Sequence, residues 1–516
     1  MLARIRSAAV LGIDAYLVDV ETDIAHGLPT FATVGLPQGA VKEGRERVSA
    51  AIANAGFTFP LRRITVNLAP ADIQKHGSAF DLPIALGLLR ATGQADGRPG
   101  RARPWDDFLV VGELGLEGDV RPVRGVLSIA VAAKREGFRG IVVPEANASE
   151  AGVVVGLDVR AAATLSGVVD FFEGEGDLPR AEVDLDSLFE LRTADHVDFA
   201  DVKGQAHAKR ALEVAAAGGH NILMVGPPGS GKTMLARRLA TILPRMSLEE
   251  ALETTKIHSV AGVLPSGESL VAVRPFRAPH HTISDAGLIG GGPYPRPGEV
   301  SLANGGVLFL DELPEFRKNV LEVLRQPLED GVVTIARAAM SLTYPARFML
   351  AAAMNPCPCG YHGDPAHHCT CGAVGVERYL ARVSGPLLDR IDIHLEVPAV
   401  RWRELTDQAS GEGSAAIRER VETARERQRE RFAERVGVFA NAHMAPKDLR
   451  VHCRVSDGAD ALLRSAITRL GLSARAYHRI LKIARTIADL DGAAGLTPKH
   501  VSEAIQYRSL DRLGTR

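Results

Sequence analysis

The pattern of apolar and polar residues changes along the chain and divides it into two α/β segments and a helical segment. In residues 1–175, short apolar runs such as 108–111 and 140–143 alternate with stretches of helical spacing, which predicts an α/β unit. The clearest helical stretch is followed by Gly56, as is typical of a helix end. Its apolar residues fall at i, i+3, i+4 and i+7: Val48, Ala51, Ile52 and Ala55.

The rest of the chain holds a second α/β segment and a helical one. Residues 176–196 are acidic and weakly periodic, so we expect a linker there. In residues 197–400, apolar runs bounded by glycine and proline alternate with helical spacing, the pattern of a parallel sheet wrapped by crossover helices. Helical spacing dominates residues 401–516. The predicted fold class is therefore α/β with a C-terminal helical domain.

The composition is that of ordinary folded domains. The 516 residues suffice for about three domains. Hydrophobic residues make up 46% and charged residues 24%, which excludes wholesale disorder and fibrous architectures. No apolar run is long enough to cross a membrane, and five cysteines are too few for a disulfide framework. We expect a cytoplasmic protein with no membrane partner.

Charge is distributed unevenly along the chain. The formal net charge is −1, yet residues 401–516 hold 22 Lys and Arg against 15 Asp and Glu. A basic terminal third is compatible with nucleic-acid binding, but the nearly neutral total means that such binding needs arranged patches. Residues 418–435 alternate Arg and Glu, which fits a solvated helix with i,i+4 pairs or a grip on nucleic acid.

A phosphate-binding motif lies between the apolar run 221–225 and the helical stretch 234–243. Its spacing, G-x-x-x-x-G-K-[ST], lets backbone N–H groups wrap a phosphate. The lysine reaches the β- and γ-phosphate oxygens, and the threonine hydroxyl binds Mg²⁺. The motif consists of Gly226, Pro227, Pro228, Gly229, Ser230, Gly231, Lys232 and Thr233.

A second motif, which contains two acidic residues, decides the class of nucleotide enzyme. The apolar run 307–310 predicts a buried strand that delivers Asp311 to the Mg²⁺ and places Glu312 to polarise the attacking water. The phosphate loop alone would also fit kinases and GTPases. With the acidic pair, the sequence predicts a hydrolytic ATPase that uses ATP and Mg²⁺.

Two polar residues downstream complete the candidate site. The apolar run 348–354 predicts another buried strand, and Asn355 at its end can orient the water beside the γ-phosphate. Arg390 follows a short helix and is a candidate finger that reaches the γ-phosphate bound by a neighbouring subunit. The alternative for Arg390 is an intramolecular ion pair with Asp389 or Asp392.

These motifs resemble the AAA+ superfamily, with Walker A at 226–233, Walker B at 307–312, sensor 1 at Asn355 and an arginine finger at Arg390. Four further phrases, together with these motifs, resemble the magnesium-chelatase-like ATPases of the YifB/ComM competence-protein family over essentially the whole chain. The phrases are DVKGQ at 201–205, FRAPHHT at 276–282, MNPCPCG at 354–360 and SGPLLDRID at 384–392.

The resemblance implies an AAA+ P-loop core in 197–400, a helical lid in 401–516 and self-association into a ring, expected to be a hexamer. It implies that Arg475, at the head of a lid helix, is sensor 2, although a helix-surface arginine is the plain alternative. It also implies an ATP-driven branch-migration helicase that acts on branched or single-stranded DNA in recombination during natural transformation.

Two loops are candidates for DNA contact. Residues 329–337 and 342–347 look like the arms of a hairpin between Walker B and sensor 1, with Arg337 near its tip. In related helicases this hairpin lines the pore. In the glycine-rich loop 290–298, Tyr294 could stack on a base and Arg296 could neutralise a phosphate. A plain surface connection remains the alternative for each loop.

The N-terminal domain, 1–175, resembles the Lon-protease fold through residues 75–83 and 112–125. Lon proteases use a Ser-Lys dyad, and the position of the lysine is taken here by Leu127. Without that base Ser78 has no activator, so we expect no peptidase activity and a scaffolding, ring-forming or DNA-positioning role.

Four cysteines cluster in one short window, as two C-x-C pairs separated by nine residues. In a reducing compartment they suit four thiolates around Zn²⁺ or another soft metal, and reduced free thiols or a redox pair are the alternatives. His280 and His281 are adjacent to each other and have no cysteine near them in the sequence, so we expect them to be structural or close to the phosphates. The cluster consists of Cys357, Cys359, Cys369 and Cys371.

Two other classes of function compete with a DNA motor. A chelatase-type motor would drive a partner protein in metal insertion or remodelling, but the N-terminal domain and the C-x-C insert depart from that arrangement. A non-catalytic scaffold is disfavoured, because a degenerate ATPase would lack at least one residue of the site.

Overall fold

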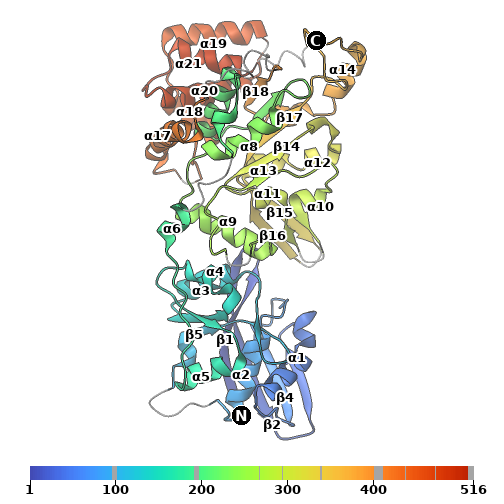
Figure 1. The fold of residues 1–516 in the computed structure, drawn as a ribbon, viewed down its shortest axis with the longest axis vertical. Helices are drawn as coiled ribbons and strands as arrows, with labels where there is room; N and C mark the ends of the chain where they lie inside the picture. The colour runs from blue at the N-terminus through green and yellow to red at the C-terminus, as the bar shows by residue number, and fades with distance from the viewer. Residues whose placement is uncertain are drawn as a thin grey trace. The chain divides into compact units, whose positions relative to one another are not determined.

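The computed structural model divides the chain into two compact units, each with its own hydrophobic core (Figure 1). Unit 1 comprises Met1–Leu191 with Ala251–Ala272, and unit 2 comprises Arg192–Glu250 with Val273–Arg516. The structure describes residues 1–95, 102–190, 197–265, 268–292, 295–337, 340–399, 411–435, 437–470 and 472–508.

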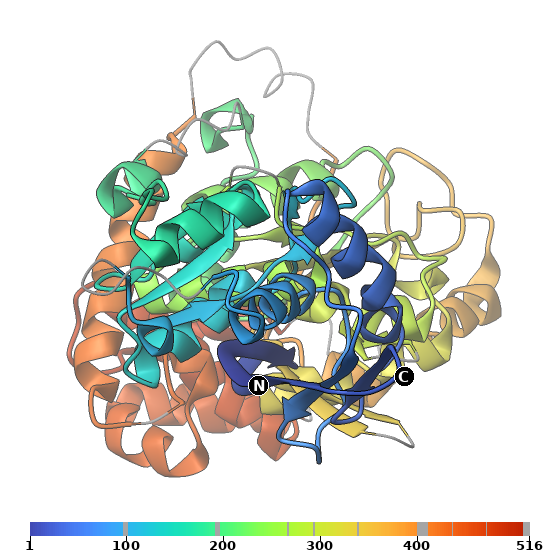
Figure 2. The same ribbon diagram turned by 90° about the horizontal axis from the view of Figure 1, so that it is seen from below.

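Unit 1 begins with a four-stranded sheet of order β1-β2-β4-β3, whose strands are blue in Figure 2. β1 and β4 pair with β2 in antiparallel fashion, and β3 pairs parallel with β4. Three of the four apolar residues of the predicted helix, Val48, Ala51 and Ile52, are buried in α1, and the fourth, Ala55, caps its end, which confirms that helix. The elements are β1 (Leu2–Leu11), β2 (Asp14–Ala25), β3 (Thr30–Val34), β4 (Arg63–Ala69), α1 (Ala40–Asn54) and α2 (Asp81–Ala91).

A three-stranded parallel sheet, β5-β8-β9, follows in unit 1. Its first two strands fall where the apolar runs 108–111 and 140–143 predict them. The elements are β5 (Phe108–Val110), β6 (Glu113–Leu114), β7 (Val120–Arg121), α3 (Val126–Arg135), β8 (Gly140–Pro144), α4 (Ala148–Gly152), β9 (Asp158–Ala162), α5 (Leu165–Glu173) and α6 (Leu185–Glu190).

A segment from the middle of the sequence also packs in unit 1. The helix α9 (Leu248–Ala261) contributes most of its residues to this unit. The hydroxyl of Ser259 donates to the carboxylate of Glu150 and accepts a hydrogen bond of 3.0 Å from the backbone of Gly125. Ser259 and Glu150 are buried, and so is the hydrogen bond from Gly125. The Ser259 hydroxyl therefore has its hydrogen-bond partners inside the unit.

The core of unit 2 is a five-stranded parallel sheet of order β11-β14-β17-β10-β18. Its central strands are buried throughout, which explains their continuous apolar runs. The predicted strands at 221–225, 307–310 and 348–354 are confirmed. The elements are β10 (Ile222–Val225), β11 (Phe276–Arg277), β14 (Val307–Leu310), β17 (Met349–Met354), β18 (Ile393–Glu396), α7 (Ala206–Gly218) and α8 (Lys232–Ile242).

Short elements connect the strands of this sheet. The predicted hairpin is present, with β15 and β16 paired from Val332↔Pro345 to Arg337↔Met340. A second, smaller pair is β12-β13. The elements are α10 (Asp285–Ile289), β12 (Gly290–Gly291), β13 (Arg296–Pro297), α11 (Glu299–Leu302), α12 (Lys318–Glu322), α13 (Arg325–Asp330), β15 (Val332–Arg337), β16 (Met340–Pro345), α14 (Gly372–Leu380) and α15 (Gly385–Leu388).

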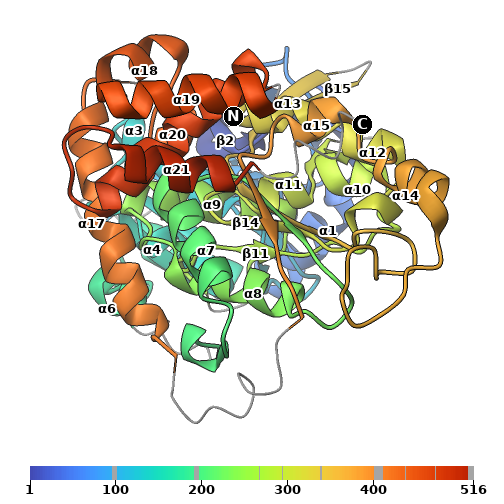
Figure 3. The same cartoon turned by 90° about the horizontal axis from the view of Figure 1, so that it is seen from above.

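The C-terminal part of unit 2 is helical, as predicted, and its helices lie together in orange and red in Figure 3. They are α17 (Ser414–Phe432), α18 (Pro446–His452), α19 (Asp457–Leu470), α20 (Ala474–Leu490) and α21 (Pro498–Gln506). The predicted fold class is thus confirmed: mixed α/β, with a parallel sheet flanked by helices and a C-terminal helical region. Within the described part of the chain, no helix combines the length and the apolar character that a membrane crossing requires.

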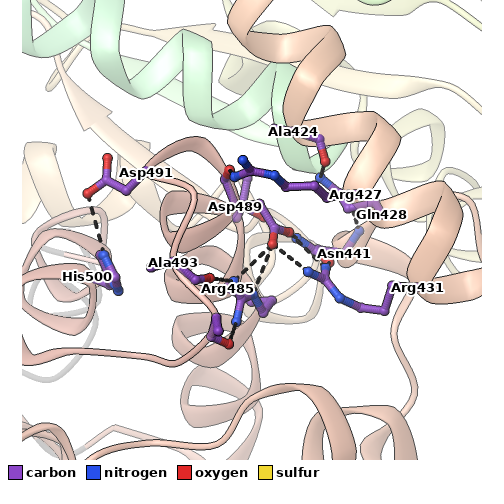
Figure 4. Close-up of polar contacts among 12 residues, drawn as sticks. Ala424, Arg427, Gln428, Arg431, Asn441, Arg485, Asp489, Asp491, Ala493 and His500 are labelled. Atoms are coloured by element: carbon purple, nitrogen blue, oxygen red, sulfur yellow. Dashed lines mark hydrogen bonds and ion pairs between the residues drawn. The ribbon is translucent and has the colours of Figure 1, made fainter.

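A buried carboxylate joins three helical segments of this region (Figure 4). Asp489 of α20 is 1% exposed and accepts hydrogen bonds from Arg431 at 2.8 Å, Asn441 at 2.8 Å and Arg485 at 3.1 Å. The two guanidinium groups neutralise a charge that would be costly to bury alone. This cluster therefore fixes α17 and α20 against each other.

Candidate nucleotide-binding site

The strand order of unit 2 brings the predicted site residues to one edge of the sheet. β17 lies between β10 and β14, and all three strands run parallel. Their carboxyl ends therefore meet at the same edge, where open α/β sheets bind ligands. The phosphate loop follows β10, Asp311 follows β14, and Asn355 follows β17.

The phosphate loop has the backbone that its glycines predict. Gly229 and Gly231 have φ values of 76° and 89°, in the left-handed region that favours glycine. A methyl group on Gly226 would lie 2.1 Å from the carbonyl oxygen of Val397, so only glycine fits there. The loop leads directly into α8 at Lys232, and the free N–H groups of that helix start favour an anion.

Lys232 is held at the mouth of the loop. Its side-chain nitrogen donates to the carbonyl oxygens of Gly226 at 2.7 Å and Pro227 at 2.9 Å, and to Oδ1 of Asn355 at 3.2 Å. Burial lowers the pKa of Lys232, and the charge of Asp311 opposes this effect. The lysine thus links the loop 226–233 directly to Asn355, the candidate sensor 1 residue.

Two oxygen atoms suited to Mg²⁺ lie side by side. Oγ1 of Thr233 donates a hydrogen bond of 2.7 Å to Oδ2 of Asp311. A hydroxyl and a carboxylate are hard ligands, and Mg²⁺ in phosphoryl-transfer sites takes one or two protein ligands together with phosphate oxygens and water. The donor set present therefore fits this ion.

Glu312 stands on a backbone conformation that is rare for its residue type. Its φ is 53°, and its side chain is 58% exposed. Such positions cost free energy and cluster at functional sites. The carboxylate pairs with Nδ1 of His281 at 3.3 Å, and the His281 ring lies 4.1 Å from that of His280.

Sequence reasoning did not identify two residues of this site. His281 was expected only to be structural or close to the phosphates, and its pairing with Glu312 was not foreseen. Gln205 has no role predicted from the sequence beyond its place in a family motif, yet its side-chain amide donates to the carbonyl oxygen of Ser230 in the phosphate loop at 2.7 Å. β11, which precedes His281, has only two residues and leaves no periodic signal.

The two candidate arginines for a neighbouring phosphate have partners within the chain. Arg390 is 9% exposed, pairs with Glu329 and donates to the carbonyl oxygen of Pro386 at 2.6 Å. The alternative role expected for Arg390 was an ion pair with Asp389 or Asp392, but its partner is Glu329. Arg475 is 65% exposed and lies 3.8 Å from Asp389.

Asp392 forms an ion pair with α20, the helix that carries Arg475. Its buried carboxylate pairs with Arg479 of α20 and with His220 at 3.2 Å, and His220 contacts Thr486 at 2.8 Å. Burial alone would raise the pKa of Asp392, but the charge of Arg479 and the contact with His220 outweigh it and lower the pKa. The head of α20 is therefore held close to the start of β18.

The candidate DNA-contact loops lie against each other. Arg296 of β13 stands opposite Gly291, and a methyl group on Gly291 would lie 3.1 Å from a guanidinium nitrogen of Arg337. Tyr344 of β16 donates to the carbonyl oxygen of Pro295 at 2.8 Å. Both arginines are exposed, so two adjacent hairpins present positive charge to solvent. Tyr294 lies outside the described residues.

In unit 1, the hydroxyl of Ser78 contacts the carboxylate of Glu113. The nearby Lys75 is buried and donates to backbone carbonyl oxygens, that of Ile73 at 2.8 Å. Leu127 is fully buried in α3.

Comparison with known proteins places the chain in a family. It is 46% identical to "Competence protein ComM" of Haemophilus influenzae over 514 residues, which is 99% of this chain and 98% of that protein. The chain belongs to the YifB/ComM family of magnesium-chelatase-like ATPases. It is also 44% identical to "Uncharacterized protein YifB" of Escherichia coli over 99% of this chain and 98% of that protein.

Family models of magnesium chelatase match three parts of the chain. "Subunit ChlI of Mg-chelatase" matches residues 20–147, "Magnesium chelatase, subunit ChlI" matches 198–405, and "Magnesium chelatase, subunit ChlI C-terminal" matches 411–508. The "Magnesium-chelatase 38 kDa subunit" of Rhodobacter capsulatus is 27% identical over 31% of this chain and 50% of that subunit. Membership in this AAA+ family implies ATPase activity with ATP and Mg²⁺, and AAA+ proteins typically form oligomers.

We expect Lys232→Ala to weaken ATP binding. Hydrogen bonds to charged groups contribute about 1.5–3 kcal/mol, so Kd should rise roughly 10- to 150-fold. A titration with fluorescent ATP measures this, and Lys499→Ala, which removes an exposed lysine of the helical region, is the control. Unchanged affinity in Lys232→Ala would mean that this side chain does not touch the nucleotide.

Proposed function

We propose that this chain is the subunit of a ring-shaped ATPase that moves DNA in the cytoplasm, and that its reaction is branch migration during natural transformation. The convergence of Lys232, Thr233, Asp311 and Asn355 at one sheet edge supports ATP hydrolysis. The relative from Haemophilus influenzae is named a competence protein, which supports a role in DNA uptake or recombination.

Each side chain at the sheet edge has one role in the proposed reaction. Lys232 neutralises the β- and γ-phosphate oxygens of ATP. Thr233 and Asp311 hold Mg²⁺, which offsets the charge that develops on the phosphates. Glu312 polarises the attacking water and Asn355 orients it, and the nucleotide lies against the loop 226–233.

We also propose that the site is shared between subunits of a ring, expected to be a hexamer. Arg390 then acts as the finger on a neighbour's γ-phosphate and Arg475 as sensor 2. In this proposal Arg390 exchanges Glu329 for the phosphate when the ring assembles. The exposed guanidinium of Arg475 needs no such exchange, because its described contact with Asp389 is long, at 3.8 Å.

The two adjacent hairpins are the proposed DNA-contact surface. Arg337 of β15 and Arg296 of β13 are exposed on the two hairpins, and Tyr294, two residues before Arg296 in the sequence, is proposed to contribute to the same surface. Guanidinium groups bind phosphates without regard to base sequence, which suits a motor that moves along branched or single-stranded DNA.

The alternative is a motor that drives a partner protein in metal insertion or remodelling. The match of the family model "Magnesium chelatase, subunit ChlI" to residues 198–405 and the similarity to the 38 kDa subunit of Rhodobacter capsulatus favour it. The two functions differ in what stimulates hydrolysis: DNA in the first case and a protein partner in the second.

Steady-state ATP hydrolysis with no DNA, single-stranded DNA, duplex DNA and a four-way junction tests the proposal. We expect DNA to stimulate hydrolysis, most strongly with the junction, and expect no stimulation in Glu312→Gln. Hydrolysis that is indifferent to every DNA would overturn the DNA motor and favour the partner-driven alternative.

Arg337→Gln should reduce the DNA-dependent part of hydrolysis and lower the slope of DNA affinity against salt by about 1, because one phosphate contact is lost. Arg337→Lys keeps the charge on the same hairpin and should retain both. DNA titrations at several salt concentrations measure the slope. A loss of hydrolysis without DNA as large as the loss with DNA would contradict a DNA-contact role.

A further inference from the structure

The four clustered cysteines of unit 2 come together in space, although nine residues separate the two C-x-C pairs. The sulfur atoms of Cys357, Cys359, Cys369 and Cys371 all lie within 4.8 Å of one another. The distance from the sulfur of Cys357 is 3.3 Å to that of Cys359 and 3.8 Å to that of Cys369. Two segments of the chain thus place four soft ligands around one point.

These distances fit a single tetrahedral metal ion. A Zn–S bond of about 2.3 Å requires neighbouring sulfur atoms about 3.8 Å apart in a tetrahedron. A disulfide requires about 2.05 Å, and all four cysteines are free thiols here. A group of sulfur atoms this compact leaves room for one ion and not for several irons with bridging sulfides.

The backbone also supports thiolate ligands. The amide of His362 donates to the sulfur of Cys357, and the amide of Cys359 donates to the sulfur of Cys371, both at 3.3 Å. Such N–H donors orient metal-bound sulfur and favour its charged form. Nδ1 of His367 lies 3.6 Å from Oδ1 of Asp364, a carboxylate outside the cluster.

The loop that carries the first cysteine pair touches the phosphate loop. It begins directly after Asn355, and a methyl group on Gly360 would lie 2.5 Å from Cδ of Pro228. Any shift of this loop therefore moves groups that contact the nucleotide site. The cysteines stand where a rigid cross-link would hold both Asn355 and Pro228 in place.

We propose that Cys357, Cys359, Cys369 and Cys371 form a zinc tetrathiolate site, and that the bound zinc braces the phosphate loop through the contact between Gly360 and Pro228. The zinc is structural, because four protein ligands leave no open position for substrate. The site goes beyond the proposed motor function and does not depend on DNA as the partner.

Metal analysis of the full-length protein tests the site. We expect about one zinc per chain after purification without added metal. The double variant Cys369→Ser/Cys371→Ser should lose it, whereas Cys453→Ser, which changes a buried cysteine of the helical region, should keep it. Iron in place of zinc, or equal zinc in all three proteins, would overturn the assignment.

Adding zinc to metal-free full-length protein distinguishes a zinc site from the two alternatives, reduced thiols and disulfides. We expect it to take zinc from a chromophoric chelator with about one equivalent bound. If it takes none and all five cysteines react as thiols, the cluster is a set of reduced thiols. A mass lower by two hydrogens for each bond would instead reveal disulfides.

Two glycines of the loop test the brace without touching a ligand. Gly360 and Gly363 have φ values of 88° and 80°, so alanine strains the backbone similarly at both. Only Gly360 contacts Pro228; nothing lies within 4 Å of a methyl group at Gly363. Both variants should keep zinc, but Gly360→Ala should weaken ATP binding roughly 10- to 100-fold more than Gly363→Ala. Equal affinities would refute the brace.

Discussion

Glu312→Gln is expected to slow ATP hydrolysis by about 100-fold or more while ATP still binds. The amide keeps the size of the side chain but cannot accept a proton from the attacking water. Lys232, Thr233 and Asp311, which contact the phosphates and Mg²⁺ in the proposed mechanism, are unchanged. Single-turnover hydrolysis and a titration with fluorescent ATP measure the two effects separately.

Glu315→Gln is the matched control for this substitution. Glu315 lies three residues downstream, is 44% exposed and pairs with Arg382 at 3.0 Å. Losing a surface pair of this kind changes stability by less than about 1 kcal/mol. We therefore expect nearly normal turnover. Turnover in Glu312→Gln equal to that of the control would assign the water-activating role to another group.

Arg390→Ala should lower the turnover number by roughly 10³- to 10⁵-fold, the range found when an arginine finger is absent. The reason is that the guanidinium offsets charge on the γ-phosphate only as the bond breaks, so ATP should still bind. Because Arg390 is buried and paired with Glu329, the variant also loses an internal ion pair. Glu329→Gln removes that pair and leaves the arginine, and it should hydrolyse ATP almost normally.

Mixing two inactive proteins tests whether Arg390 acts on a neighbour. In a ring of Arg390→Ala and Glu312→Gln subunits, some interfaces combine the intact Glu312 of one subunit with the intact Arg390 of the next. We expect the mixture to regain hydrolysis that neither protein has alone. A mixture as inactive as its components, under conditions in which mixed rings form, would place Arg390 within its own subunit's structure.

Motifs that are continuous in sequence could be predicted because their geometry is local. A buried strand, a glycine loop and a helix start follow one another at 222–232, and the left-handed conformation of Gly229 and Gly231 in that loop favours glycine. The same holds for β14 with Asp311, for the β15-β16 hairpin and for the periodic helices of the C-terminal region. In each case neighbouring residues specify the element.

What the sequence by itself determined, then, is the class of fold, and it also singled out the candidate residues of the phosphate site. The tertiary structure decided which residues meet. The order β14-β17-β10 brings Asn355 to Lys232, and two-residue β11 delivers His281 to Glu312. Residues 251–272 join unit 1, and Glu329 pairs with Arg390 across 61 positions of sequence. Periodicity reports only which face of an element is buried; long-range packing chooses its partner.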